Sequence, residues 1–330
     1  MDAVDLVSPN ESDATQLRTN INGKILGSIG YLSELARDDA DQTDDGIELV
    51  AEDKISGFLH IHYHDCVSHL KSDEKAAALT CLSHINRSLK RTDRPHVSGL
   101  FASVDEQYNH DAYMRVSNKS FLSTYGAPLD ASRLDGVSCQ QSVDATNEAL
   151  DWLKESDPTL YDELSIYVTD VLLVHSDTMN AASSVNSMGI VRMSHLKPGQ
   201  NWTRYYENLV HEAAHQHLNY IWSEHELIEN EDSGTYASPL RQEPRPLSGI
   251  LHAAFVLART MRGISMLNEN GSYDPARHPI STAYNNKKNP ASFREKFDDC
   301  IETLQKHAKF TDFGAELFSE MQVFADQYQT

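Results

Sequence analysis

The spacing of apolar residues predicts helices through most of the first half of the chain. Residues 15–37 carry Leu17, Ile21, Ile25 and Ile29 at intervals of four, which places them on one face of a helix. The same kind of pattern predicts further helices at residues 47–70, 73–90, 145–155 and 161–167. Residues 95–104 are predicted to be extended.

The pattern changes in the middle of the chain. Residues 170–175 (DVLLVH) and 188–193 (MGIVRM) are continuous apolar runs of strand length. A linker follows, and residues 205–219 (YYENLVHEAAHQHLN) then predict a helix. This order places the second strand as an exposed edge beside that helix, where a substrate peptide could add as a further strand.

The remaining pattern is helical again, at residues 247–261 and over most of 290–327. We therefore expect a predominantly helical α+β fold. A mainly helical N-terminal region, residues 1–140, precedes a catalytic region, residues 141–330, in which a small sheet lies beside the 205–219 helix. The two regions are expected to form one compact unit.

Composition narrows the class of protein. The 330 residues carry a net charge of −21, which argues against nucleic acid and anionic membranes as partners. No apolar run approaches the ~18 residues of a membrane span, and the acidic, polar first residues lack the features of a signal peptide. The four cysteines show no CxxC spacing, so we expect free thiols and a cytoplasmic protein: Cys66, Cys81, Cys139 and Cys300.

The motif His211-Glu212-Ala213-Ala214-His215 lies inside the predicted 205–219 helix. Residues four apart share one face of a helix, so the two imidazoles can bind one metal ion. Glu212 lies next to them, where it can contact a metal-bound water. The motif therefore predicts a metal site, and both hydrolysis and oxygen chemistry stay open until the third ligand is identified.

Two kinds of third ligand are available. A zinc peptidase would take a downstream glutamate, and the candidates lie in one charged stretch: Glu224, Glu226, Glu229 and Glu231. The metzincin pattern is excluded, because Leu218 and Ile221 occupy the positions of its glycine and its third histidine. His252 lies in an otherwise apolar predicted helix that begins after Pro246. Beside an HExxH helix, we favour His252 as a ligand over a core histidine.

The segment LVHEAAH, followed by a loop and SPLRQEPRPLSGILHAAF, resembles the HExxH-type peptide β-hydroxylases. These are iron(II)- and 2-oxoglutarate-dependent dioxygenases that modify ribosomally made peptides. The resemblance covers residues 188–259. It implies a zincin-like catalytic region, a precursor peptide as substrate, and three iron ligands: His211, His215 and His252.

The co-substrate and the substrate need side chains of their own. Arg245, and after it Arg241, is expected to bind the distal carboxylate of 2-oxoglutarate, because a guanidinium pairs with a carboxylate in a two-pronged contact. Arg192 and His195 are predicted to contact the peptide. In such a dioxygenase Glu212 would not bind the iron itself, and we expect it to orient a ligand histidine or a water molecule.

Two other functions remain open from the sequence. One is a zinc metallopeptidase with Glu212 as general base, and the other is a zincin-like domain that binds a peptide without catalysis. A second metal site at the HIHYH stretch is a weaker hypothesis. On a strand His60, His62 and His64 would share a face, and on a helix only His60 and His64 would.

Overall fold

The computed structural model describes residues 6–37, 50–52, 54–85, 90–104, 106–238, 243–281 and 291–328. The chain forms two compact units, each built from segments that are separate in the sequence. The helical unit comprises Met1–Glu11, Ala145–Leu164 and Pro198–Thr330, and the sheet unit comprises Ser12–Asp144 and Ser165–Lys197. The units therefore interleave along the chain, whereas the sequence-based division has a single boundary at residue 140.

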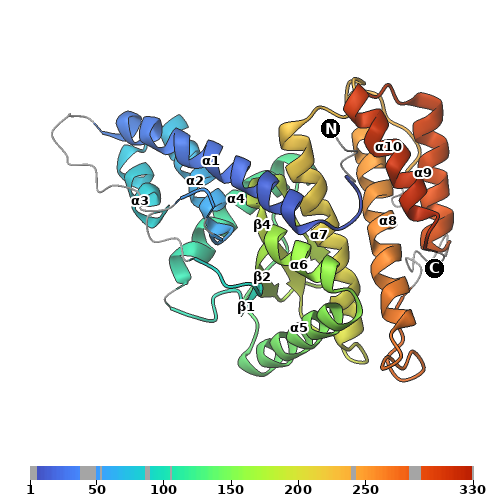
Figure 1. The fold of residues 1–330 in the computed structure, drawn as a ribbon. Helices are drawn as coiled ribbons and strands as arrows, with labels where there is room; N and C mark the ends of the chain where they lie inside the picture. Colours follow the sequence, from blue (N-terminus) through green and yellow to red (C-terminus); the bar gives the residue numbers. More distant parts are fainter. Residues whose placement is uncertain are drawn as a thin grey trace. The chain divides into compact units, whose positions relative to one another are not determined.

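The sheet unit contains four strands in the order β1-β2-β4-β3, visible in part in Figure 1. Strands β1 (His96–Gly99), β2 (Val168–Val174) and β4 (Gly189–Ser194) run parallel, and β3 (Ala181–Ala182) pairs antiparallel with β4. Every residue of β2 and β4 is buried. Burial on both faces explains why each strand reads as a continuous apolar run rather than an alternating one.

The predicted exposed edge at the second strand is wrong. β4 lies between β2 and β3, so Arg192 has Leu172 as its partner on one side and Ala182 on the other. The two-residue strand β3 gave no signal in the apolar pattern, because a strand of two alanines has no period to detect. Addition of a peptide strand at this end of β4 is therefore blocked by the chain itself.

Four helices complete the sheet unit: α1 (Glu11–Ala36), α2 (Phe58–Lys71), α3 (Lys75–Ile85) and α4 (Gln107–Tyr125). Helices α2 and α4 cover one face of the sheet through a core that includes Phe58, Tyr113, Leu172 and Ile190. Gly57 at the start of α2 permits this contact. A Cβ atom at Gly57 would lie 2.7 Å from the backbone carbon of Gly189, so a side chain there would push the helix off β4.

Helices form the other unit: the end of α5 (Gly136–Ser156), most of α6 (Pro158–Tyr167), then α7 (Trp202–Glu224), α8 (Leu247–Glu269), α9 (Phe293–His307) and α10 (Asp312–Ala325). α8 packs against α7, α9 and α10. Figure 1 shows α8 running alongside α9 and α10. Ser292 caps α9 in a reciprocal pair of bonds with Glu295, which satisfies free backbone N–H groups at the helix start.

Within the described residues, α8 is the one helix whose length and composition would allow it to cross a membrane, and 78% of its most apolar window is buried inside the protein. Burial against three neighbouring helices accounts for that apolar composition.

The fold class expected from sequence is confirmed as a predominantly helical α+β structure with a small sheet. Helix α2 begins at Phe58, later than the predicted start at residue 47, and residues 47–49 lie outside the described part of the chain. Helix α4 was not predicted at all. Its sequence, QYNHDAYMRVSNKSFLSTY, is rich in polar residues and has a weak apolar stripe.

Because the HIHYH stretch is helical, it does not present three histidines on one face. The His62 ring instead forms a 2.7 Å hydrogen bond with Asn109 and stacks on Tyr108. His60 and His62 are 4% and 0% exposed. These two rings are core groups of the sheet unit, and among the described residues they join no metal-ligating set.

Lowering the pH from 7 to 5 is expected to destabilise the metal-free protein. Burial lowers the pKa of His60 to about 3 and that of His62 to about 4, whereas a histidine in the unfolded chain titrates near ~6.5. Between these values the unfolded chain binds more protons, so stability is lost as the pH falls below the unfolded value. The free energy of unfolding should drop by up to about 2 kcal/mol for each ring.

Urea unfolding at the two pH values measures this loss. A His62→Gln variant should show a smaller difference between pH 7 and pH 5, while a variant of an exposed ring in the other unit, His307→Gln, should keep the full difference. An unfolding free energy that is the same at both pH values in the wild-type protein would contradict the prediction.

Candidate metal centre

The HExxH motif lies in the middle of α7, as predicted. Asn201 starts this helix, because its side-chain oxygen accepts a 2.9 Å hydrogen bond from the backbone N–H of Thr203. Most of α7 is buried, including Glu212 and the alanines between the two histidines. The partly exposed positions Glu207, His211, His215 and Asn219 recur every four residues. The histidines therefore lie on the one stripe of the helix that is open to a ligand.

The two motif histidines face each other through the same ring atom. His211 Nε2 and His215 Nε2 lie 3.2 Å apart, and their ring centroids are 4.9 Å apart. Two nitrogens bound tetrahedrally to one zinc-sized ion would lie about 3.3 Å apart, and slightly closer on an octahedral ion. Both atoms are therefore already at the separation that a shared metal requires.

His252 comes from α8 and lies against the same site. Its ring centroid is 4.7 Å from that of His215, and it also stacks on Trp222 at 6.3 Å. The ring bonds to the backbone of His215, while its Nε2 atom is buried and has no hydrogen-bond partner among the described residues. A histidine that donates one ring N–H to a backbone carbonyl and keeps the other nitrogen available is the usual arrangement of a metal ligand.

The three histidines do not form a closed set of ligands. Among the described residues, one set of three ligating groups has all its atoms within 4.8 Å of one another, and it lies in the sheet unit. Metal binding by His252 would require its nitrogen to move toward the other two. The structure brings the three rings together, and His252 as third ligand remains a prediction.

Burial keeps the imidazoles of His211 and His252 neutral, which is the form that binds metal. Burial, and then the neighbouring His252, lowers the pKa of His211 to about 4. Burial also lowers the pKa of His252 to about 4; its bond to the His215 backbone opposes this shift, and the charge of Arg245 adds to it. At neutral pH each of these two rings is therefore uncharged and has one nitrogen with a lone pair that can bind a metal.

Arg245 lies at the start of α8, near His252. Its backbone forms an antiparallel bridge with Tyr236, with both N–H···O distances at 2.8 Å. Its side chain lies over Gly249, where a Cβ atom would be 3.4 Å from Arg245 Cδ and 3.7 Å from Nη1. Gly249 is three residues before His252, so the guanidinium lies on the face of α8 that carries the histidine. The other predicted arginine, Arg241, lies outside the described residues.

Sequence reasoning missed Glu207, one turn before His211. Burial raises the pKa of Glu207 to about 7, the nearby Glu212 carboxyl adds to the rise, and Arg204 opposes it. The four-residue interval from Glu207 to His211 to His215 was the signal that could have revealed it. Glu212 itself is 5% exposed, so α7 places two acidic groups close together at this site.

The glutamates that could act as the third ligand of a zinc peptidase lie in the segment that follows α7. Glu226, Glu229 and Glu231 are exposed. Their segment is tied to the approach to α10, since Glu229 N–H donates to the carbonyl of Lys309 at 2.8 Å. Within the described residues, none of these carboxylates joins His211 and His215 in a ligand set.

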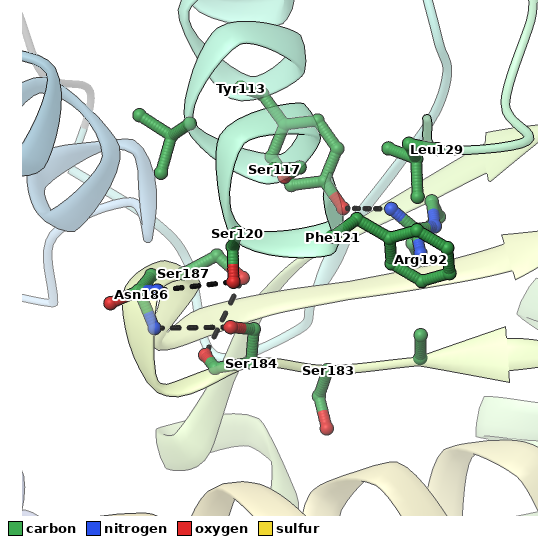
Figure 2. Close-up of a pocket in the computed structure, with 12 residues that line it drawn as sticks. Tyr113, Ser117, Ser120, Phe121, Leu129, Ser183, Ser184, Asn186, Ser187 and Arg192 are labelled. Carbon is green, nitrogen blue, oxygen red and sulfur yellow. Dashed lines mark hydrogen bonds between the residues drawn. The ribbon is translucent and has the colours of Figure 1, made fainter. Parts of the chain in front are cut away.

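Arg192 and His195, the predicted substrate contacts, belong to the sheet unit rather than to the unit that holds the histidines. Arg192 is 4% exposed and lines a cavity (Figure 2). The His195 ring stacks on His175, with ring centroids 4.7 Å apart. Both contacts lie within the sheet unit, and binding of a peptide by these two residues remains a prediction.

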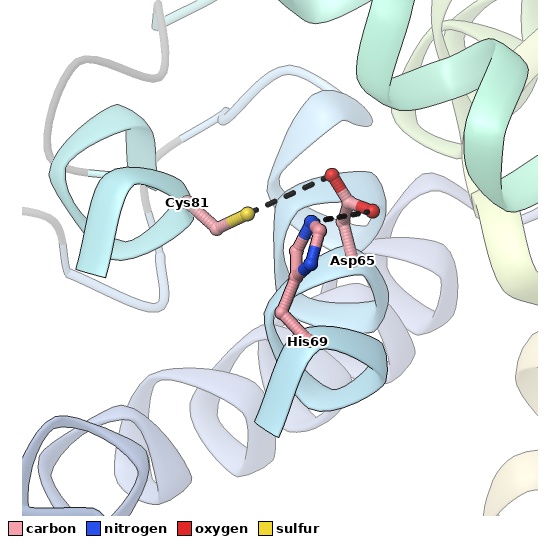
Figure 3. A group of neighbouring side chains, drawn as sticks. All are labelled: Asp65, His69 and Cys81. Carbon is pink, nitrogen blue, oxygen red and sulfur yellow. Dashed lines mark hydrogen bonds and ion pairs between the residues drawn. The ribbon is translucent and has the colours of Figure 1, made fainter. Parts of the chain in front are cut away.

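The closed ligand set in the sheet unit is Asp65, His69 and Cys81, shown in Figure 3. Asp65 Oδ2 accepts a 2.7 Å hydrogen bond from Arg115, and His69 bonds to Glu74 at 2.5 Å. Burial raises the pKa of the Cys81 thiol to about 11, so the sulfur is protonated. The Arg115 guanidinium already compensates the charge of the buried Asp65, and this arrangement fits a network of ion pairs better than a cation site.

The four cysteines are free thiols, as predicted. No protein-family model matches the chain, and no curated protein matches it either.

Proposed function

We propose that this protein is an iron(II)- and 2-oxoglutarate-dependent dioxygenase that hydroxylates a side-chain β-carbon of a ribosomally made peptide. The observation that carries the proposal is the approach of His211 Nε2 and His215 Nε2 to 3.2 Å, with the His252 ring packed against His215. Three histidine ligands on one side of a six-coordinate iron would leave open positions for the co-substrates.

When bound, iron(II) would support the reaction of dioxygen with 2-oxoglutarate, in which one oxygen atom enters a C–H bond of the peptide, the other enters succinate, and carbon dioxide is released. The chain's own residues have simpler tasks. Neutral His211, His215 and His252 would hold the metal, and the bond from the His252 ring to the His215 backbone fixes its orientation. Arg245 would bind the distal carboxylate of 2-oxoglutarate through its guanidinium.

Further parts of the proposal rest on the resemblance of residues 188–259. They are a zincin-like arrangement around α7 and α8 and a precursor peptide as substrate. The position of Arg245 over Gly249 supports this reading, because it gives an acidic protein a local cation at the metal centre. A cytoplasmic location is proposed separately, from the four free cysteines.

The zinc metallopeptidase remains the rival, because a separation of 3.2 Å also suits a tetrahedral ion. It needs Glu212 as general base and a third ligand of its own. Glu212 is buried, and the glutamates downstream of α7 join no described ligand set. The His252 ring packs against His215 instead, and this contact favours the oxygenase.

The Glu212→Gln variant separates the two classes. Full-length protein, purified without oxygen, is loaded with iron(II) and mixed with 2-oxoglutarate, oxygen and each short peptide encoded near its gene, and the peptides are then weighed. The oxygenase predicts a gain of one oxygen atom and formation of succinate, and Glu212→Gln should retain both.

The zinc-loaded protein serves as the comparison. Peptide cleavage that needs no 2-oxoglutarate and is abolished in Glu212→Gln would establish the peptidase instead. Peptide binding without either reaction, in both metal forms, would leave a non-catalytic binding domain and refute the proposal.

A further inference from the structure

The sheet unit contains a cavity of about 220 Å³, bordered by α4, β3, β4 and the short helix η1 (Val185–Ser187). Its wall is rich in hydroxyl and amide groups: Ser117, Ser120, Ser183, Ser184, Asn186 and Ser187. Figure 2 shows Ser120, Ser184, Asn186 and Ser187 along one side and Arg192 at the other, beside Tyr113 and Phe121. Pockets for drug-sized ligands usually begin near ~300 Å³, so this cavity suits a group of a few heavy atoms.

Arg192 is a cation in a position that the fold otherwise keeps apolar. It lies two residues after Ile190 on β4, on the sheet face that packs against α2 and α4. It is 4% exposed. Its guanidinium donates to the hydroxyl of Tyr113 and to the sulfur of Met179, both at 3.1 Å.

Neither of those partners carries a negative charge. In the described part of the chain no carboxylate lies within ion-pair distance of Arg192, and none lines the cavity. A buried charge without a counter-charge costs free energy that a fold normally avoids. An anionic ligand in the cavity would supply the missing charge.

The chemistry of the wall indicates which anion. Arg192 is the one cation among the described residues that line the cavity, so a singly charged group is matched better than a phosphate. A guanidinium has five N–H donors, and the bonds to Tyr113 and Met179 use two of them. The remaining donors and the serine hydroxyls can bind the two oxygens of a carboxylate.

We propose that this cavity is a carboxylate-binding site with Arg192 as its charged group. The carboxylate can come from an acidic side chain of a bound peptide or from a small free dicarboxylate. The inference does not depend on the proposed function, because all the groups that carry it belong to the sheet unit and the candidate metal centre belongs to the helical unit.

Calorimetric titration of the full-length, metal-free protein tests the proposal with three probes: N-acetylglutamate amide, N-acetylglutamine amide and glutarate. The first two differ only in the carboxylate. We expect N-acetylglutamate amide or glutarate to bind at least about tenfold more tightly than the glutamine compound. Binding of the glutamate compound identifies a peptide side chain as the source, and binding of glutarate alone identifies a free dicarboxylate.

Two variants locate the binding. Arg192→Gln should lose the preference for the carboxylate, while Arg133→Gln, which removes an exposed arginine of the same unit, should keep it. If Arg192→Gln fails to fold, Ser117→Leu decides the matter, because it reduces the cavity volume and keeps the arginine. No preference for a carboxylate in the wild-type protein, or an equal preference in the cavity variants, would overturn the assignment.

Discussion

Replacing His215 by alanine is expected to weaken iron(II) binding by more than about 100-fold and to abolish succinate formation. Loss of a group that only supports a ligand already costs roughly 10–100-fold in metal affinity, so loss of a ligand should cost more. His215 has the central position, because its Nε2 lies 3.2 Å from that of His211 and its ring contacts His252. Metal content after equilibration with buffered iron(II) measures the effect.

The matched variants are His252→Ala and His225→Ala. The His252→Ala protein should lose metal as the His215→Ala protein does. The His225→Ala protein should keep its metal, because His225 is an exposed ring at the end of α7 that stacks on Phe313. Far-ultraviolet circular dichroism establishes that each variant is folded. A His252→Ala protein with full iron content and full turnover would remove His252 from the ligand set, and the metal centre would then need a carboxylate.

How well the sequence predicts this centre depends on how far apart the contacting residues are along the chain. The pairing of His211 with His215 is local, because four residues of helix fix it. The approach of His252 depends on how α7 packs against α8, which spacing along the chain cannot show. That expectation came from the resemblance of residues 188–259. Glu207 was missed because its pKa shift arises from burial and from Glu212 rather than from a motif.

The same contrast holds for the fold. β2 and β4 were predicted because burial on both faces gives long apolar runs. β3 and α4 were not predicted. β3 has only two residues, and α4 has a weak apolar stripe. The wrong prediction of an exposed edge at β4 has the same cause, because the apolar pattern does not reveal β3, the strand that pairs with β4 at Arg192. Residues of both α4 and β3 line the cavity beside Arg192, so the apolar pattern could not predict it.

The Asp170→Ala variant is expected to lose about 3–5 kcal/mol of unfolding free energy, since removing one member of a buried ion pair leaves the other charge uncompensated. Asp170, which is 1% exposed on β2, binds the guanidinium of Arg91. Its other oxygen accepts hydrogen bonds from Ser56 Oγ at 2.8 Å and from the backbone N–H of Gly57 at 3.0 Å. One carboxylate thus joins the start of α2 to the sheet.

Urea unfolding of three proteins tests that explanation. Asp177→Ala, which removes an 83% exposed carboxylate of the same unit, should change stability by no more than about 0.5 kcal/mol. The double variant Asp170→Leu with Arg91→Met should be more stable than Asp170→Ala. It removes both charges, whereas Asp170→Ala leaves the charge of Arg91 without a counter-charge. A double variant that is less stable than Asp170→Ala would show that an uncompensated charge on Arg91 does not account for the lost stability.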